Sequence, residues 1–101
     1  MRLMTKEIER AFPKLREMDG RNPDEVKVVA KFFTPDAQWT WYATEWDGED
    51  TFFGYVDGHE REYGYFSLSE LKKVRGGLGL PVERDRHFKA TLGQVIRRER
   101  S

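Results

Sequence analysis

The aromatic residues of this chain are concentrated in the middle third of its sequence. Twelve of the 14 Phe, Trp and Tyr residues lie between Phe32 and Phe66, in runs separated by turns rich in Gly, Pro and Asp. Short runs of this kind are typical of β-strands. Strands are therefore predicted at residues 26–33, 38–46, 51–56 and 61–66. Short connections favour antiparallel neighbours, so the pattern predicts a four-stranded antiparallel β-meander.

Helices are predicted on either side of these strands. Thr5 is a candidate N-cap for a helix that ends near Pro13, which has no backbone N–H to donate. Segments 67–70 and 91–94 have the Ser/Thr-x-x-Glu/Gln spacing of a capping box and predict two further helices, the first ending at Gly76-Gly77.

The predicted fold is α+β, with an N-terminal helix and two C-terminal helices packed mainly on one face of the meander. A length of 101 residues is that of one domain. The predicted single domain, 1–101, consists of a helix and lead-in, the meander and a helical part, at residues 1–18, 25–67 and 67–101.

Aromatic side chains are predicted on both faces of the sheet. Because side chains alternate along a strand, Trp39 and Trp41 share one face, and Tyr42 and Trp46 share the other. Two interpretations stay open. Either helices cover both faces and bury the rings, or one face is left uncovered and forms a docking surface or a dimer interface.

Charge is distributed as unevenly as the aromatic residues. The formal net charge is zero, from 18 basic and 18 acidic residues, but residues 36–62 carry eight carboxylates and one arginine. This balance excludes a uniformly basic nucleic-acid binder. The acidic segment would repel phosphates, whereas it could attract the basic surface of a nucleic-acid-handling protein.

Candidate catalytic and metal sites are sparse. There is no Cys and there are two His, which excludes disulfides and thiolate zinc sites. Carboxylates at 45–50 are oxygen ligands of the kind that hard cations prefer, but they lack calcium-loop spacing, and a solvated turn is the favoured interpretation. No cofactor or metal is therefore predicted. A small metal-dependent enzyme or a nucleotide-binding protein that uses the same carboxylates stays an alternative.

A second alternative is nucleic-acid binding through the basic C-terminal stretch. Six basic residues lie among the last 18, against two acidic ones, and basic side chains of this kind can contact phosphates. The candidate residues are Arg84, Arg86, Lys89, Arg97, Arg98 and Arg100.

Several motifs together resemble a known family. They are residues 31–46 (KFFTPDAQWTWYATEW), Asp47-Gly48-Glu49-Asp50, residues 64–71 (GYFSLSEL) and residues 79–85 (GLPVERD). This set is similar to a family of small domains of unknown function encoded on plasmids, phages and other mobile elements, and the resemblance spans about residues 13–92. It implies a setting near DNA processing or host defence, and it supplies no activity and no catalytic residues. Trp46 stands where the family pattern leads us to expect Phe.

These observations together predict a non-catalytic binding protein of a mobile element. It would bind and modulate a DNA-handling or host-defence protein, as a monomer or homodimer, through an acidic, aromatic-rich hairpin surface. No uncharged run exceeds eight residues, so no membrane segment or signal peptide is expected, and a cytoplasmic location is predicted. The candidate partner-binding residues are Asp36, Trp39, Trp41, Tyr42, Glu45, Trp46, Asp47, Glu49 and Asp50.

Overall fold

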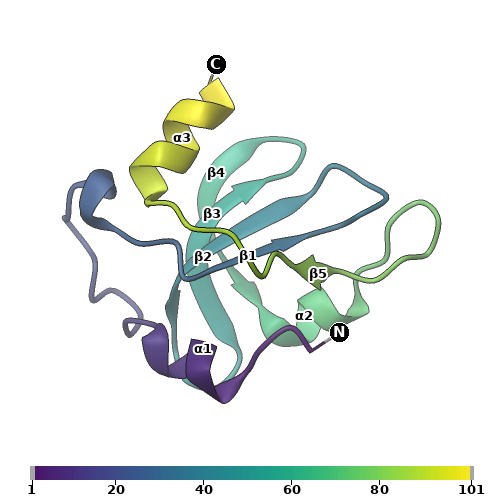
Figure 1. The fold of residues 1–101 in the computed structure, drawn as a ribbon, viewed down its shortest axis with the longest axis horizontal. Helices are drawn as coiled ribbons and strands as arrows, with labels where there is room; N and C mark the ends of the chain where they lie inside the picture. Colours follow the sequence, from purple (N-terminus) through teal and green to yellow (C-terminus); the bar gives the residue numbers. More distant parts are fainter. Residues whose placement is uncertain (1, 101) are drawn as a thin grey trace.

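The computed structural model describes residues 2–100, with side chains to residue 98, and has an α+β architecture (Figure 1). Its elements in chain order are α1 (Lys6–Ala11), the 3-10 helix η1 (Pro23–Glu25), β1 (Ala30–Phe33), β2 (Thr40–Trp46), β3 (Thr51–Asp57), β4 (Arg61–Ser67), α2 (Leu68–Lys73), β5 (Glu83–Arg84) and α3 (Leu92–Arg100). The strands form one antiparallel sheet in the order β4-β3-β2-β1-β5. The predicted meander is confirmed, and the short β5 extends it beyond β1.

The first predicted strand is longer than the observed one for a physical reason. Val26 and Val28 are buried, as strand residues would be, but their backbones bond to the segment that leads into α3. Val28 N–H donates to Ala90 O at 3.0 Å, and Leu92 N–H donates to Val26 O at 2.7 Å. Residues 26–28 therefore hold the start of α3 against the sheet instead of extending β1.

The predicted helix caps are confirmed. The Thr5 hydroxyl accepts from Ile8 N–H, and the Ser67 hydroxyl accepts from Glu70 N–H at 3.1 Å. Thr91 and Gln94 form the reciprocal pair of a capping box, at 2.8 and 3.2 Å. Helix α2 ends at Lys73, before the predicted stop at Gly76-Gly77.

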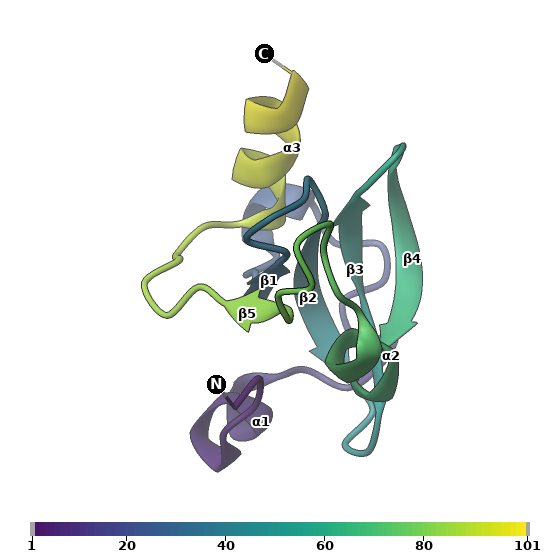
Figure 2. The same ribbon diagram turned by 90° about the vertical axis from the view of Figure 1, so that its right-hand side faces the viewer.

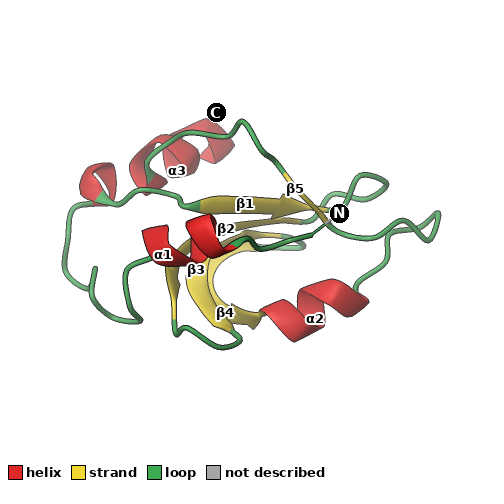
Figure 3. Ribbon diagram, turned by 60° about the horizontal axis from the view of Figure 1, so that its bottom comes forward, coloured by secondary structure: helices red, strands yellow, loops and turns green. Residues whose placement is uncertain are grey.

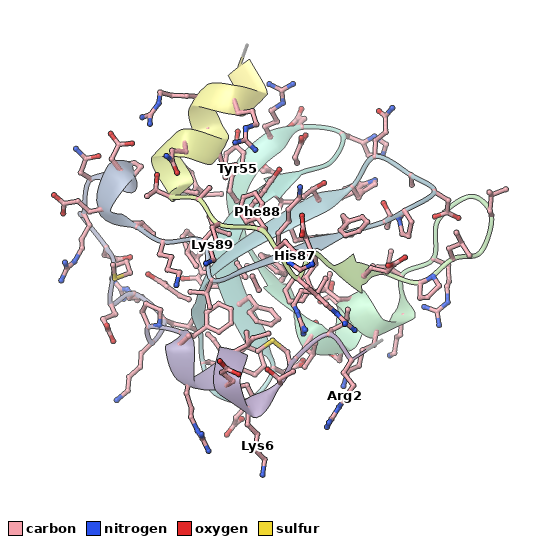
Figure 4. All side chains as sticks on the ribbon, in the orientation of Figure 1. Arg2, Lys6, Tyr55, His87, Phe88 and Lys89 are labelled. Atoms are coloured by element: carbon pink, nitrogen blue, oxygen red, sulfur yellow. The ribbon has the colours of Figure 1, made fainter. Side chains whose placement is uncertain are left out.

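Hydrophobic cores lie on both faces of the sheet. One core includes Phe32, Phe52 and Leu71, with side chains of α1 and α2 packed against it. The other includes Tyr42, Tyr55, Leu92 and Val95, and α3 covers it. Figure 3 shows α3 and α2 on opposite sides of the sheet, and Figure 4 places Tyr55 and Phe88 near the first turn of α3. The expectation that the helices lie mainly on one face is therefore wrong for α3.

A β-bulge changes the side-chain alternation of β2. The pairing with β3 shifts between Ala43 and Glu45, which adds one residue to β2. Trp46 consequently joins Trp41 in the first core, whereas strict alternation predicted it on the face of Tyr42. That prediction is wrong because the alternation rule holds only for an unbroken ladder.

Candidate functional site

A hollow lies at one end of the sheet, beside the β3–β4 hairpin. It has a volume of about 730 Å³. Its walls are polar and come from the start of β2 and from the hairpin: Gln38, Thr40, Asp57, Gly58, His59, Glu60 and Arg61. We call this hollow, together with the adjacent Trp39, the hairpin cleft.

Trp39 is the aromatic side chain of the hairpin cleft. It is half-buried, stacks on Trp41 at a centroid distance of 5.8 Å and meets the His59 ring edge-on at 5.3 Å. A Cβ on Gly58 would overlap its ring, so glycine lets the hairpin backbone lie directly against the indole. Trp39 is fixed in place by Thr34, whose hydroxyl accepts from Trp39 N–H at 3.1 Å.

The charges of the hairpin cleft are those of the hairpin itself. Asp57 and Glu60 are acidic, and Arg61 is basic. Arg61 Nε lies 3.7 Å from Asp57 Oδ1, an exposed ion pair of small energetic weight. A fixed indole edge, an imidazole and carboxylates on one surface suit binding of a basic, partly apolar group on another macromolecule.

Four of the nine predicted partner-binding residues are buried in the fold. Trp41, Tyr42, Glu45 and Trp46 are each exposed by 7% or less. The rings of Trp41, Tyr42 and Trp46 pack inside the two cores, and Glu45 is enclosed beside them, so these side chains are not on the surface. Of the predicted aromatic residues, Trp39 alone stays at the surface.

Glu45 is tied to the chain segment before η1. Its Oε1 accepts from Arg16 N–H at 2.7 Å, and its Oε2 accepts from Met18 N–H at 3.1 Å. Arg16 has a φ of 71°, a left-handed conformation that is unfavourable for a residue with a Cβ. The carboxylate therefore holds a strained segment against the sheet.

Asp36 holds the loop between α2 and β5. Its Oδ2 accepts from Leu78 N–H at 2.7 Å and from Leu80 N–H at 3.2 Å. Its Oδ1 is enclosed, without a hydrogen-bond partner, and lies against Gly76, where a Cβ would overlap it. Asp36 is therefore part of a loop closure.

The carboxylates of the β2–β3 turn are also used within the chain. Asp47 Oδ1 accepts from the N–H groups of Glu49, Asp50 and Thr51 at 2.8–3.0 Å. Desolvation alone would raise the pKa of Asp47, but these donors outweigh it and hold that pKa below its usual value. Asp50 accepts from Ser69 N–H and Ser69 Oγ–H at 2.9 and 2.7 Å, which ties the turn to α2. The Glu49 side chain is exposed.

A family comparison connects this structure to other proteins. A model of a family described as "Protein of unknown function (DUF2958)" matches residues 3–96. The chain belongs to this family. Comparison with curated proteins finds no match, and comparison with solved structures finds none.

The predicted basic residues of this family member are spread over β5, α3 and the segment between them. Arg84 Nη1 donates to Arg2 O and Leu3 O at 3.0 and 2.7 Å, and Arg97 Nη1 pairs with Asp24 Oδ1 at 2.6 Å. β5 and α3, which carry these two arginines, lie well apart in Figure 1. Arg86, Lys89 and Arg98 are exposed, and the Arg100 side chain lies outside the described residues.

Among the described side chains, no group of three or more His, Asp and Glu residues is arranged to hold a metal ion. Within the described part of the chain, no helix has the length and apolarity to span a bilayer.

Sequence reasoning missed two parts of the surface. Asp57, His59 and Glu60 were visible as hairpin residues, but only the fold brings them beside Trp39. Tyr63 and Tyr65 of β4 are 49% and 62% exposed, and they were not among the predicted partner-binding residues. Their exposure follows from α3, which covers β2 and β3 but not the outer part of β4.

Proposed function

We propose that this chain is a non-catalytic binding protein of a mobile element that binds and modulates a DNA-handling or host-defence protein. The docking surface is the hairpin cleft. The observation that carries the proposal is the half-buried Trp39, which contacts His59 in the wall of a hollow of about 730 Å³ that Asp57 and Glu60 also line.

The chemistry of the hairpin cleft favours a partner with a basic surface. Asp57 and Glu60 supply attraction during encounter, and the indole edge of Trp39 supplies apolar contact area once the partner is seated. Enzymes that act on DNA present basic surfaces to phosphates. A protein of that class therefore has the basic surface that the carboxylates of the cleft would attract.

The proposed role is binding, because the carboxylates considered for catalysis have structural duties. Glu45, Asp47 and Asp50 each accept hydrogen bonds from the backbone of their own chain. Their orientation is set by those bonds. The geometry at the β2–β3 turn thus offers no separate support for the alternative of a metal-dependent enzyme.

The test is affinity capture from cell extract, followed by reconstitution with the purified captured protein. We expect a DNA-handling protein whose activity on DNA changes when this chain is added. Asp57→Asn/Glu60→Gln should weaken binding about tenfold, or about 1.4 kcal/mol, since it removes the acidic groups from the cleft.

The matched control is Glu7→Gln/Glu9→Gln, which removes the same charge from exposed positions on α1. Helix α1 lies at the opposite end of the molecule from the hairpin (Figure 1). Equal weakening by both double variants would reject the hairpin cleft as the docking surface. An unchanged activity of the purified partner would reject the modulating role.

A further inference from the structure

Strand β4 is a long, open edge of the sheet. The sheet has two edge strands, β4 and β5, and β5 is only two residues long. β4 runs for seven residues, has no proline and pairs with β3 without a bulge. Natural edge strands are usually shortened, bulged or covered, because a long open edge invites pairing with another strand. Figure 2 shows β4 at the right-hand limit of the molecule, with no element beyond it.

The hydrogen-bond pattern shows which residues of β4 face outward. Leu68 N–H donates to Asp50 O at 2.8 Å, and Gly58 N–H donates to Glu60 O at 3.0 Å, at the two ends of the β3–β4 ladder. In an antiparallel ladder the bonded pairs recur at every second residue. The pairs through residues 62, 64 and 66 therefore bond to β3. The backbone groups of Arg61, Tyr63, Tyr65 and Ser67 point away from the sheet.

The side chains next to this edge form an exposed aromatic row. Tyr63 and Tyr65 are 49% and 62% exposed, more than any other Phe, Trp or Tyr of the described residues. Phe53 on β3 stacks parallel to Tyr63 at 6.3 Å and meets Tyr65 edge-on at 5.0 Å. Tyr55 contacts Tyr63 at 5.6 Å. The row is thus supported from one side and open on the other.

We propose that β4 pairs with β4 of a second copy of this chain, antiparallel and across a two-fold axis at Gly64. The dimer has one continuous sheet, and this inference is independent of the hairpin cleft. The reason for a second copy is the self-complementarity of the strand. Tyr-Gly-Tyr reads the same in both directions about Gly64, so Tyr63 of each copy lies opposite Tyr65 of the other.

In this register the outward-facing backbone groups of Tyr63 and Tyr65 find partners. Tyr63 of one copy and Tyr65 of the other form a hydrogen-bonded pair, and the two-fold axis repeats this pair. Arg61 of each copy lies opposite Ser67 of the other. No two like charges are opposite each other, and cross-strand aromatic pairs stabilise a sheet. A symmetric contact that places one patch against itself is the commonest arrangement in homodimers. A contact made by one strand is small, so we expect a dissociation constant in the micromolar range.

The test is sedimentation of the full chain over roughly 1 to 500 μM, which brackets a micromolar dissociation constant. The wild type should change from monomer to dimer across this range. Tyr63→Lys/Tyr65→Lys and Tyr63→Glu/Tyr65→Glu should each stay monomeric, because like charges lie opposite each other. A 1:1 mixture of the two variants should form a heterodimer.

The matched control is Leu78→Lys/Leu80→Lys, which places lysines at two exposed hydrophobic positions outside β4. It should dimerise like the wild type. If the lysine or glutamate variants fail to fold, Tyr65→Pro replaces them, because the N–H of Tyr65 faces outward and its loss removes no bond to β3. A monomeric wild type at the highest concentration, or dimers of Tyr65→Pro as stable as those of the wild type, would overturn the proposal.

Register is tested separately by Tyr63→Lys/Tyr65→Glu in one chain. With Gly64 on the axis, each lysine lies opposite a glutamate, so this variant should dimerise. A register with Tyr63 on the axis places lysine against lysine. Monomers of this variant, beside dimers of the wild type, would reject the Gly64-centred register.

Discussion

Glu45 is the most enclosed carboxylate among the described residues, at 3% exposure. Its two oxygens accept from two backbone N–H groups, those of Arg16 and Met18. A buried donor that loses its acceptor carries the full cost of its desolvation. Glu45 therefore contributes more to the stability of the fold than the exposed carboxylates around it.

Glu45→Gln should destabilise the protein. The amide has one oxygen, so its NH₂ group would face one of the two N–H donors and leave it unsatisfied, at a cost of about 1–3 kcal/mol. For a domain of this size, each kcal/mol lowers Tm by about 4–8 °C. Thermal unfolding followed by circular dichroism measures the change. The control Glu49→Gln, at an exposed position, should stay within about 0.5 kcal/mol of the wild type; an equal effect of both would contradict the role of Glu45.

Asp47 should make stability depend on pH under acidic conditions. Three backbone donors lower the pKa of Asp47 in the folded state, so the folded state stabilises the ionised carboxylate more than the protonated one. The stabilisation is present above the unfolded pKa of about 3.9 and is lost as pH falls through the lower folded pKa. Asp47→Asn should thus be less stable than the wild type at pH 7, with a gap that narrows below about pH 4. Urea titrations from neutral to acid pH measure the gap, and a constant gap would contradict the assignment.

At the scale of the elements, the aromatic runs and the turns between them predicted β1 to β4, and the alternation of side chains predicted which face each ring of β2 takes. The alternation failed at Trp46, because a bulge shifts the register of β2 and the strand carries no glycine or proline to mark it. Trp41 and Tyr42 were correctly predicted on opposite faces, but the burial of both was one of two interpretations that the sequence left open. It depends on α2 and α3 lying on different sides of the sheet, which is set by long-range packing and not by local pattern.

Likewise, the candidate site was predicted in part. Trp39 was identified from its strand, whereas the duties of Asp36 and Asp50 depend on partners far along the chain, in the loop before β5 and in α2. A charge count gives the sign of a segment. It does not show which carboxylates already accept bonds from distant N–H groups.

Two facing glycines offer a matched test of strand packing. Gly54 and Gly64 are opposite each other on β3 and β4. A Cβ at Gly54 would overlap the carbonyl oxygen of Tyr42 on β2, whereas a Cβ at Gly64 meets nothing within 4 Å. Gly54→Ala should destabilise by about 1–3 kcal/mol or more, since rigid backbone must move. Gly64→Ala should be neutral or stabilise by up to about 1 kcal/mol, because glycine is unfavourable inside a strand. Urea unfolding measures the change in the free energy of unfolding for each variant. Similar changes for the two variants would contradict this account of the packing.

At the scale of the whole molecule, one sheet carries two cores, so the two faces should unfold together. All three Trp residues belong to or pack on the first core, while Val95 of α3 lies in the second. Val95→Ala should cost about 1–3 kcal/mol through the cavity it leaves. Small domains unfold in one cooperative step, so this change should shift the Trp fluorescence transition as far as the transition in circular dichroism. A shift in circular dichroism without a shift in fluorescence would mean that α3 and its core unfold separately from the rest of the sheet.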